Sequence, residues 1–354
     1  MTNPKRIFVA ALNWGLGHAA RCVPIIRELQ QQGVEVVIGS DSEALWFLKN
    51  EFSELESIEL PSYNVRYKYS NMFLNIAPQL PKLLRILSIE RNFLGHIIKS
   101  QKIDALISDN RYGLYSDKIP TVFLTHQLNI RISNPLISAA INNLNRFYLK
   151  KFDFVWIPDT EGTPNLSGEL GHGMAMDKIR YIGPQSRLDN TLEANTNYDI
   201  VAILSGPEPQ RTYFENILKA QLLKMPQKSL LIRGCPNCET ETGVNPEIKA
   251  FANAEEIAKL MKGAKLLILR SGYSSLMDMA KVEAKHILLV PTPGQTEQEY
   301  LAERLVYQGH IMTQKQSDID IENAWNEKEN FRGFNALFTS EHLTNAVAEF
   351  LNRV

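Results

Sequence analysis

Short runs of apolar, largely β-branched residues alternate with amphipathic stretches along most of the 354-residue chain. Such short apolar runs are typical of strands in a parallel sheet that helices cover on both faces. They lie at Ile7–Leu12, Val34–Ile38, Ala105–Ile107, Thr121–Leu124, Phe154–Ile157, Ile200–Leu204, Ser229–Ile232, Lys265–Leu269 and His286–Val290. Because helix-like stretches separate them, the pattern predicts an α/β protein with doubly wound parallel sheets.

A polar stretch over residues 185–197 lacks apolar periodicity and interrupts this alternation. We interpret it as a linker. It divides the chain into an N-terminal domain over 1–185 and a C-terminal domain over 198–339, and a helix over 340–354 follows. That helix carries Leu343 and Val347 on one side, so it can pack back on the N-terminal domain. Two domains suit a chain of this length.

The composition is that of an ordinary globular enzyme, with 44% hydrophobic and 22% charged residues. A formal net charge of −1 gives no chain-wide case for nucleic-acid binding. The apolar N-terminal run fits a buried strand better than a signal peptide, and no run reaches the roughly 18 residues of a spanning helix. The three cysteines, Cys22, Cys235 and Cys238, suggest no disulfide framework, which favours the cytoplasm. We expect Cys235 and Cys238 to be free thiols in a loop; a redox pair is the alternative.

A glycine-containing turn, Asn13-Trp14-Gly15-Leu16-Gly17-His18, separates the first strand from the first long helix. In an open parallel sheet this edge faces the ligand crevice, and glycines let the backbone approach a ligand closely. A histidine here has a pKa suited to acid–base work, so His18 is a candidate base. The alternatives are that Gly15 and Gly17 only serve the turn and that His18 only bonds to the start of the helix.

Two further polar loops follow predicted strands at the same edge of the N-terminal sheet. Asp109 comes after Ala105–Ile107, and His126 comes after Thr121–Leu124. Asp109 is a second candidate base, and His126 a candidate acceptor contact. For His126 a buried histidine that is bonded to the backbone explains the sequence equally well.

In the C-terminal half, Leu269 ends a strand, and Arg270-Ser271-Gly272 turns into a helix. Backbone N–H groups at such a helix start suit a diphosphate, with Ser271, Gly272 and Ser274 as binding residues. Asp278 lies one helical turn beyond Ser274, on the same side, where its carboxylate can accept hydrogen bonds from both ribose hydroxyls.

The loop Ser205-Gly206-Pro207-Glu208-Pro209-Gln210-Arg211 follows the first strand of the second domain. Ser205 and Gly206 are candidate diphosphate contacts, and the planar fork of Arg211 can neutralise phosphate charge. The alternative for Arg211 is a surface salt bridge. The loop over 291–299 carries carboxamides and carboxylates that can bond sugar hydroxyls, but Gln295 and Glu297 can equally be solvated residues that cap the next helix.

The combination of Gly15-Leu16-Gly17-His18 with Arg270-Ser271-Gly272 through Asp278, and then Gln298-Glu299, resembles family 28 glycosyltransferases. That family includes the N-acetylglucosaminyltransferase that completes lipid II and the plant galactolipid synthases. The resemblance implies the GT-B fold, in which two Rossmann-like domains face each other across a cleft. It also implies an inverting, metal-independent transfer from a nucleoside-diphosphate sugar, expected to be a UDP-sugar that acts as co-substrate, with no cofactor.

Matched position by position, the resemblance implies specific roles for residues of this chain. His18 lines the catalytic cleft; Ser271, Gly272 and Ser274 hold the donor diphosphate; and Asp278 stands where the family has a ribose-binding glutamate. Phe251 and Ala252 fall in the base-binding stretch, while Gln298 and Glu299 touch the donor sugar. The first loop has fewer glycines than the family's, and Ser205–Arg211 carries two prolines, so acceptor and donor sugar can differ.

The acceptor is expected to be a glycan, a lipid-linked sugar or a small molecule, in cell-envelope or glycan synthesis. The stretches Met72–Ile98 and Ile132–Lys151 mix apolar and basic residues, as helices that bind a membrane surface do. Helices that pack on a sheet look similar, so peripheral membrane contact stays open. Two rival functions remain. One is a sugar-nucleotide hydrolase or epimerase, because the stretch Gly15–Cys22 also resembles the start of sugar-nucleotide hydrolases. The other is a non-catalytic sugar-nucleotide sensor.

Overall fold

The computed structural model describes residues 4–65, 77–132, 134–206, 208–235, 238–243, 245–334 and 341–354. These residues form two compact units. Unit 1 comprises the described residues up to 186 together with 341–354, and unit 2 comprises the described residues from 187 to 334. The chain therefore returns to unit 1 at its C-terminal end.

Unit 1 contains one parallel sheet of seven strands in the order β3-β2-β1-β4-β5-β6-β7. Its elements are β1 (Arg6–Ala11), α1 (Leu16–Gln31), β2 (Glu35–Ser40), α2 (Ser42–Glu51), β3 (Glu56–Glu59), the 3₁₀ turn η1 (Ala77–Gln79), α4 (Leu80–Ser100), β4 (Ala105–Asp109), β5 (Thr121–Leu124), α5 (Pro135–Leu149), β6 (Phe154–Ile157), η2 (Gly168–Leu170), β7 (Ile179–Tyr181) and α11 (Glu341–Leu351).

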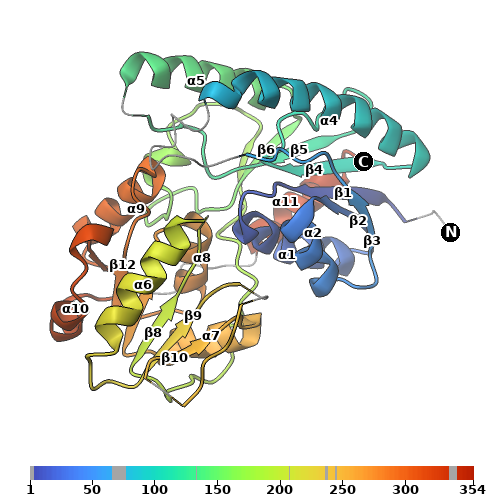
Figure 1. Cartoon of the computed structure of the whole chain (residues 1–354). Coiled ribbons are helices and arrows are strands. Elements are labelled where there is room, and N and C mark those ends of the chain that lie inside the picture. Colours follow the sequence, from blue (N-terminus) through green and yellow to red (C-terminus); the bar gives the residue numbers. More distant parts are fainter. Residues whose placement is uncertain are drawn as a thin grey trace. The chain divides into compact units, whose positions relative to one another are not determined.

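Alternate residues of each central strand face opposite sides of this sheet. Ile7 and Val9 of β1 pack in the cluster that contains residues of α1, α2 and α11. Phe8 and Ala10 of β1 pack with residues of α4 on the other side, where α5 contributes Leu149 to a neighbouring cluster. Helices therefore cover both faces (Figure 1), which explains why the strands are apolar throughout.

Unit 2 contains a parallel sheet of six strands in the order β10-β9-β8-β11-β12-β13. Its elements are β8 (Ile200–Ile203), α6 (Gln210–Leu222), β9 (Ser229–Ile232), β10 (Glu247–Lys249), α7 (Ala254–Gly263), β11 (Leu266–Leu269), α8 (Tyr273–Lys281), β12 (Ile287–Leu289), α9 (Thr296–Tyr307), β13 (Met312–Thr313), η3 (Gln316–Asp318), α10 (Ile321–Glu327) and η4 (Lys328–Asn330). Phe214 and Leu218 of α6 pack on one face of the sheet. The prediction of two doubly wound α/β domains is confirmed.

The sequence pattern missed four strands, namely β3, β7, β10 and β13. They are the outermost strands of the two sheets, and their sequences ESIE, IRY, EIK and MT are short and mostly polar. An edge strand is paired on one side only and is often exposed, so it need not be apolar. Residues 72–76 of the first amphipathic stretch, Pro207 and Ser340 lie outside the described residues.

The expectation of two free thiols at Cys235 and Cys238 is wrong. The two cysteines form a disulfide in the loop after β9, with their Cα atoms 5.4 Å apart. A spacing of three residues is short enough for a loop to bring the two sulfurs together, and sequence pattern alone does not reveal that geometry. Cys22 is a free, buried thiol.

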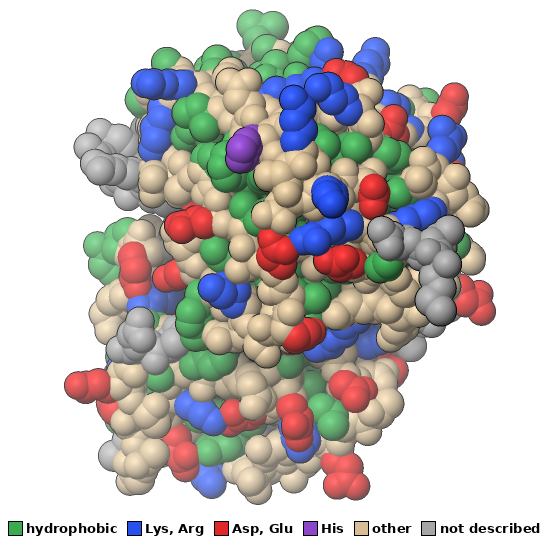
Figure 2. All heavy atoms as spheres, turned by 90° about the vertical axis from the view of Figure 1, so that its right-hand side faces the viewer, with side chains coloured by type: hydrophobic (Ala, Val, Ile, Leu, Met, Phe, Trp, Pro, Cys, Tyr) green, Lys and Arg blue, Asp and Glu red, His purple; other side chains and the backbone are tan. Residues whose placement is uncertain are grey.

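Acidic, basic and hydrophobic side chains are interspersed over the face seen in Figure 2, in keeping with the net charge of −1. In the described parts of the chain, no helix combines the length and the apolar character that crossing a membrane requires.

Candidate functional site

The strand order of unit 1 reverses between β1 and β4. From β1 the chain proceeds outward through β2 and β3, and then returns to place β4 on the other side of β1. At such a switch point the loops after the two strands diverge, and a crevice opens at their carboxyl ends. His18 follows β1, and Asp109 is the last residue of β4, paired in register with Ala11. The two candidate bases thus lie at the position where this topology binds ligands.

The turn that leads to His18 depends on one glycine. Gly15 precedes α1 with φ of 87°, a left-handed conformation that glycine adopts without the steric cost of a Cβ. The helix then begins at Leu16, so His18 lies in its first turn and Arg21 lies one turn later on the same side. The helix start has no side-chain cap.

The side chains of His18, Asp109 and Arg21 form one hydrogen-bonded cluster. His18 Nδ1 is 3.0 Å from Asp109 Oδ1, and Arg21 Nε donates to Asp109 Oδ2 at 2.8 Å. Arg21 Nη2 also donates to Asp109 Oδ1, and it lies 3.1 Å from His18 Nδ1. Asp109 and Arg21 are almost completely buried, whereas the His18 side chain is 15% exposed. Of the three, the imidazole is the one that solvent reaches.

Burial and charge set the protonation states in this cluster. Burial lowers the pKa of His18, and the Arg21 guanidinium lowers it further, while Asp109 acts in the opposite direction. Burial alone would raise the pKa of Asp109, but Arg21 and His18 hold it well below its usual range. His18 is therefore neutral and Asp109 is ionised near neutral pH. When Nδ1–H donates to Asp109, the second ring nitrogen, Nε2, is left as a proton acceptor.

His126 belongs to the same cluster but is buried. Its Nδ1 accepts a hydrogen bond from Arg21 Nη1 at 2.9 Å, and its ring is 6% exposed. His126 is thus buried, as the alternative to an acceptor contact expected. Its Nδ1, however, is bonded to an arginine side chain and not to the backbone. Cys22 also contacts Asp109, with Sγ 3.6 Å from Oδ2, and burial raises the pKa of this thiol well above its usual value.

A second buried ion network lies next to the glycine turn, and sequence reasoning missed it. Arg111 Nε donates to Glu90 at 2.7 Å, and Arg111 Nη1 donates to Asp41 at 3.2 Å. Asp41 in turn accepts from Asn13 Nδ2 at 3.1 Å, while Tyr63 donates to Glu90 at 2.7 Å. This network fixes the side chain of Asn13, which begins the glycine turn.

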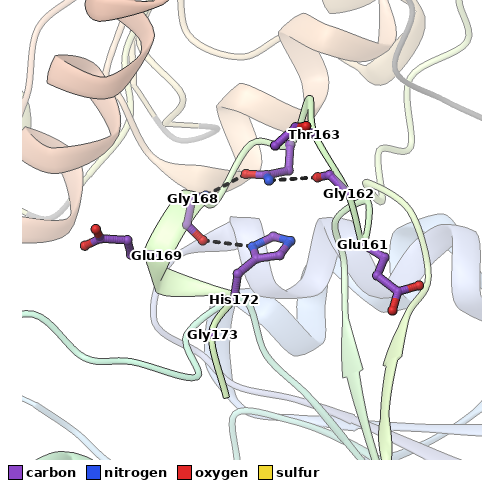
Figure 3. Close-up of a pocket in the computed structure, with 8 residues that line it drawn as sticks. Glu161, Gly162, Thr163, Gly168, Glu169, His172 and Gly173 are labelled. Carbon is purple, nitrogen blue, oxygen red and sulfur yellow. Dashed lines mark hydrogen bonds between the residues drawn. The ribbon is translucent and has the colours of Figure 1, made fainter. Parts of the chain in front are cut away.

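A pocket of about 510 Å³ lies in the loop after β6, at the same carboxyl edge of the sheet. Glu161, Thr163, Glu169 and His172 are among its lining residues. Figure 3 shows the His172 ring directed at the backbone of Gly168, whose carbonyl oxygen is 2.8 Å from Nδ1. Nε2 of the same ring is 2.9 Å from the carbonyl oxygen of Thr160. These contacts hold the loop that forms the pocket, and no motif in the sequence pointed to it.

The strand order of unit 2 reverses in the same way, between β8 and β11. Ser205 and Gly206 follow β8, and Ser271 and Gly272 follow β11. Both members of the first pair are exposed, and Gly206 has φ of 101°. These four predicted diphosphate residues therefore lie at one switch point.

Helix α8 begins directly after Gly272, which provides no side-chain cap for the helix. Ser271 is buried, and its Oγ donates to the backbone oxygen of Gln298 at 2.8 Å, so this hydroxyl supports the loop. Ser274 and Asp278 are four residues apart on α8, and both are half-buried. They therefore share one face of the helix.

Several predicted donor contacts are engaged within unit 2. Arg211 forms salt bridges with Glu208 and Glu215. This is the arrangement that the alternative interpretation of Arg211 expected. Gln298 Oε1 accepts from the backbone N–H of Thr292 at 2.8 Å, so part of its amide orders its own loop. Glu299 is exposed, while Phe251 and Ala252 precede α7, the first half-buried and the second buried.

No group of three or more histidine, cysteine, aspartate or glutamate side chains in the described residues has the arrangement of a metal site.

Comparisons with known proteins bear on the fold of the chain. Residues 217–331 match the glycosyltransferase family 28 C-terminal domain. The chain is similar in structure to the glycosyltransferase of kitacinnamycin, with a TM-score of 0.64 and 14% identity over 99% of this chain and 96% of that one. It is similar to MurG of Acinetobacter baumannii, with a TM-score of 0.54 and 15% identity over 99% and 96% of the two chains.

A third similar structure is the spinosyn rhamnosyltransferase SpnG in complex with thymidine diphosphate. Its TM-score is 0.56, with 14% identity over 98% of this chain and 92% of that one. The same protein was also solved with the spinosyn aglycone. A search of curated protein sequences finds no match to the chain. The chain thus has the GT-B fold of these solved glycosyltransferases, and within its second half residues 217–331 match the family 28 C-terminal domain.

Proposed function

We propose that the chain transfers a sugar from a uridine diphosphate donor to an acceptor hydroxyl, with His18 as the general base. The observation that carries the proposal is the cluster of His18, Asp109 and Arg21 at the switch point of unit 1. A neutral, partly exposed imidazole that is oriented by a buried carboxylate is the arrangement expected of a base near neutral pH.

In the proposed reaction, His18 Nε2 takes the proton of the acceptor hydroxyl as its oxygen attacks the anomeric carbon. The bond from that carbon to the β-phosphate oxygen breaks, and the nucleoside diphosphate leaves from the opposite face, so the anomeric configuration is inverted. Asp109 stabilises the imidazolium that forms. Backbone N–H groups at the start of α8, together with Ser274, take up the charge on the leaving group without a metal ion.

Asp278 supports the choice of a ribonucleotide. Its carboxylate lies one turn beyond Ser274 on α8, and a carboxylate can accept hydrogen bonds from both hydroxyls of a ribose. SpnG was solved with thymidine diphosphate, which supports a pyrimidine nucleoside diphosphate in general. We assign uridine because Asp278 gains a second hydroxyl partner from a ribose that a deoxyribose lacks.

The pocket after β6 is the proposed binding site for the distal part of the acceptor. Three strand spacings separate β1 from β6, or about 14 Å at roughly 4.8 Å per spacing. A hydroxyl held at His18 therefore requires an acceptor longer than one sugar ring to reach Glu161 and Glu169. An extended glycan or a lipid-linked sugar fits this distance.

The outer surfaces of α4 and α5 favour a lipid-linked acceptor. Large apolar side chains are exposed there, with Leu136 at 83% and Phe147 at 53%. The only acidic residue of the two helices, Glu90, is buried. Exposed basic residues are Lys82 and Arg85 of α4, Arg146 of α5, and Lys150 and Lys151 directly after α5. An apolar surface with one sign of charge suits an anionic membrane, and we propose peripheral binding there.

Two measurements test the function. Thermal unfolding with UDP, dTDP, ADP and UDP-sugars identifies the donor, since a bound ligand raises the unfolding temperature; UDP and a UDP-sugar should stabilise the chain most. Incubation with that UDP-sugar, with and without acceptors, followed by mass spectrometry, then identifies the products. Free sugar released equally with and without acceptor would make the chain a hydrolase, and absence of turnover would favour a sensor.

A further inference from the structure

Three arginines are almost completely buried in the described part of the chain: Arg21, Arg111 and Arg270. The first two are paired with carboxylates. Arg21 bonds to Asp109, and Arg111 bonds to Asp41 and Glu90. Arg270 differs from both, since no carboxylate among the described residues forms a salt bridge with it. Because a buried, unpaired charge is strongly unfavourable, this arginine calls for an explanation.

The contacts of the Arg270 guanidinium are all neutral. Nη1 donates to the backbone oxygens of Val290 and Pro291 at 3.1 and 3.2 Å. Nη2 donates to the backbone oxygen of Gln210 at 3.2 Å and to Gln316 Oε1 at 2.5 Å. The group stacks on the ring of Phe214, with 3.9 Å from Cζ to the ring centroid. Carbonyl oxygens orient a guanidinium, but they leave its full positive charge uncompensated.

Burial lowers the pKa of Arg270 to about 10, and no neighbouring charge contributes to this shift. The side chain still carries its proton at neutral pH. Other arginines of unit 2 are paired: Arg211 with Glu208 and Glu215, and Arg233 with Glu215 and Glu241.

The position of Arg270 connects this charge to the diphosphate loops. It is the residue between β11 and Ser271, directly before the start of α8. Its hydrogen bonds reach the first residue of α6, which follows the Gly206 loop, and Pro291 in the loop after β12. The guanidinium therefore lies beneath the meeting point of three loops at the carboxyl edge of the sheet.

Two buried polar atoms at this edge have no partner. They are Arg270 Nε and Thr292 Oγ1, two of the five such side-chain atoms found among the described residues. Thr292 is 2% exposed, and its Oγ1 lies 3.9 Å from where a Cβ on Gly206 would stand. Unpaired buried polar atoms are rare in folded proteins, so each calls for an explanation, and a bound ion is one of them. Thr292 thus gives a second, independent indication of a ligand beside Gly206.

We propose that Arg270 and Thr292 lie at the base of the diphosphate site. There the anionic ligand supplies the negative charge that no described carboxylate provides to Arg270. This inference rests on the proposed function. Arg270 is a positioning residue, because it acts through its field and through the loops that it ties together, whereas Thr292 Oγ1 can donate to a phosphate oxygen directly. Leaving the arginine unpaired keeps its charge available for the ligand.

The test compares the affinities of UDP, UMP and uridine, by calorimetry, for the wild type and for Arg270→Gln. Loss of a fixed positive charge weakens the binding of a ligand more when that ligand carries more negative charge. We expect UDP affinity to fall roughly 10- to 100-fold, UMP affinity to fall less, and uridine affinity to stay within about twofold. Arg270→Lys keeps the charge and should restore most of the ratio between UDP and uridine affinities. An equal loss for all three ligands would mean that Arg270 only supports the fold.

Lys265 provides the matched control. It precedes β11 while Arg270 follows it, so the two cations flank one strand, and Lys265 is paired with Asp199 at 2.8 Å. Lys265→Gln removes the same charge and should leave the affinities for all three ligands unchanged.

Thr292→Val should weaken UDP binding several-fold and Thr292→Ser should not; wild-type affinity in the valine variant would overturn the role of Thr292. If wild-type protein binds neither UDP nor dTDP, the proposed function fails, which is a different result from an equal loss in the variant.

Discussion

Arg21 and Asp109 form a two-point ion pair inside unit 1, in which Nε and Nη2 of the guanidinium meet the two carboxylate oxygens. The pair joins the first helix to the end of β4 across 88 positions of sequence. It leaves Asp109 ionised and fixed in place, so the carboxylate can orient His18 Nδ1. A bidentate pair is geometrically specific as well as strong, and the two predictions for His18 follow from it.

Replacement of His18 should separate catalysis from donor binding. In His18→Gln we expect kcat for sugar transfer to fall about 10²- to 10⁴-fold, the usual contribution of a positioned base. UDP affinity should change less than about twofold, because the residues proposed to bind the donor lie in unit 2. Initial rates and calorimetry check this. Transfer at near wild-type rate in the variant would exclude His18 as the base.

The pH dependence of the reaction should reflect the lowered pKa of His18. The neutral imidazole is the active form. As the pH falls, kcat/KM should therefore stay constant and decline only below ~6.5, the pKa of an ordinary histidine. Asp109 raises the pKa of His18; the acid limb of Asp109→Asn should therefore move to still lower pH, with a reduced plateau. An acid limb that moves upward in this variant would contradict the assignment. Circular dichroism should establish that the variant is folded.

Asp278 should discriminate between ribose and deoxyribose. We expect Asp278→Ala to weaken UDP binding by about 10- to 100-fold, the loss of hydrogen bonds to a charged group. Binding of dUDP, which has one hydroxyl fewer, should weaken less. Calorimetry with both nucleotides measures the difference, and an equal loss for the two would remove the 2′-hydroxyl from the proposed contacts of Asp278.

The buried pair of Arg111 and Glu90 should contribute strongly to stability. Both side chains are completely buried, and removing one partner of such a pair leaves the other charge uncompensated, at a cost of about 3–5 kcal/mol. Glu90→Gln should lower the free energy of unfolding by at least the lower end of this range, measured with urea. The matched control is Glu255→Gln, which breaks the more exposed helical pair with Lys259 and should change stability by less than about 0.5 kcal/mol.

Membrane binding should depend on the apolar residues of α5. The double variant Leu136→Glu, Phe147→Glu should lose most of its co-sedimentation with vesicles that contain acidic phospholipid, because two exposed apolar contacts become negative charges. Leu223→Glu alters an exposed leucine of unit 2 and serves as the control. Wild-type protein that fails to sediment with acidic vesicles, or binds neutral ones equally well, would refute an anionic membrane as the partner.

The sequence by itself determined the central strands, because a strand covered on both faces must be apolar wherever it occurs. It also located the Gly15 turn, His18, Asp109 and the start of α8, since loops that follow parallel strands meet at one edge. These features depend on neighbouring residues in the chain, and local pattern therefore reveals them.

Only the tertiary structure decided which charged groups meet. It paired Arg21 with Asp109, engaged Arg211 with Glu208 and Glu215, and gave Arg270 no carboxylate partner among the described residues. It also placed the polar edge strands, whose pairing on one side imposes no apolar pattern. The physical reason is the same in each case: an ion pair or a strand pair joins residues that are far apart in sequence, and periodicity records only what lies within a few residues.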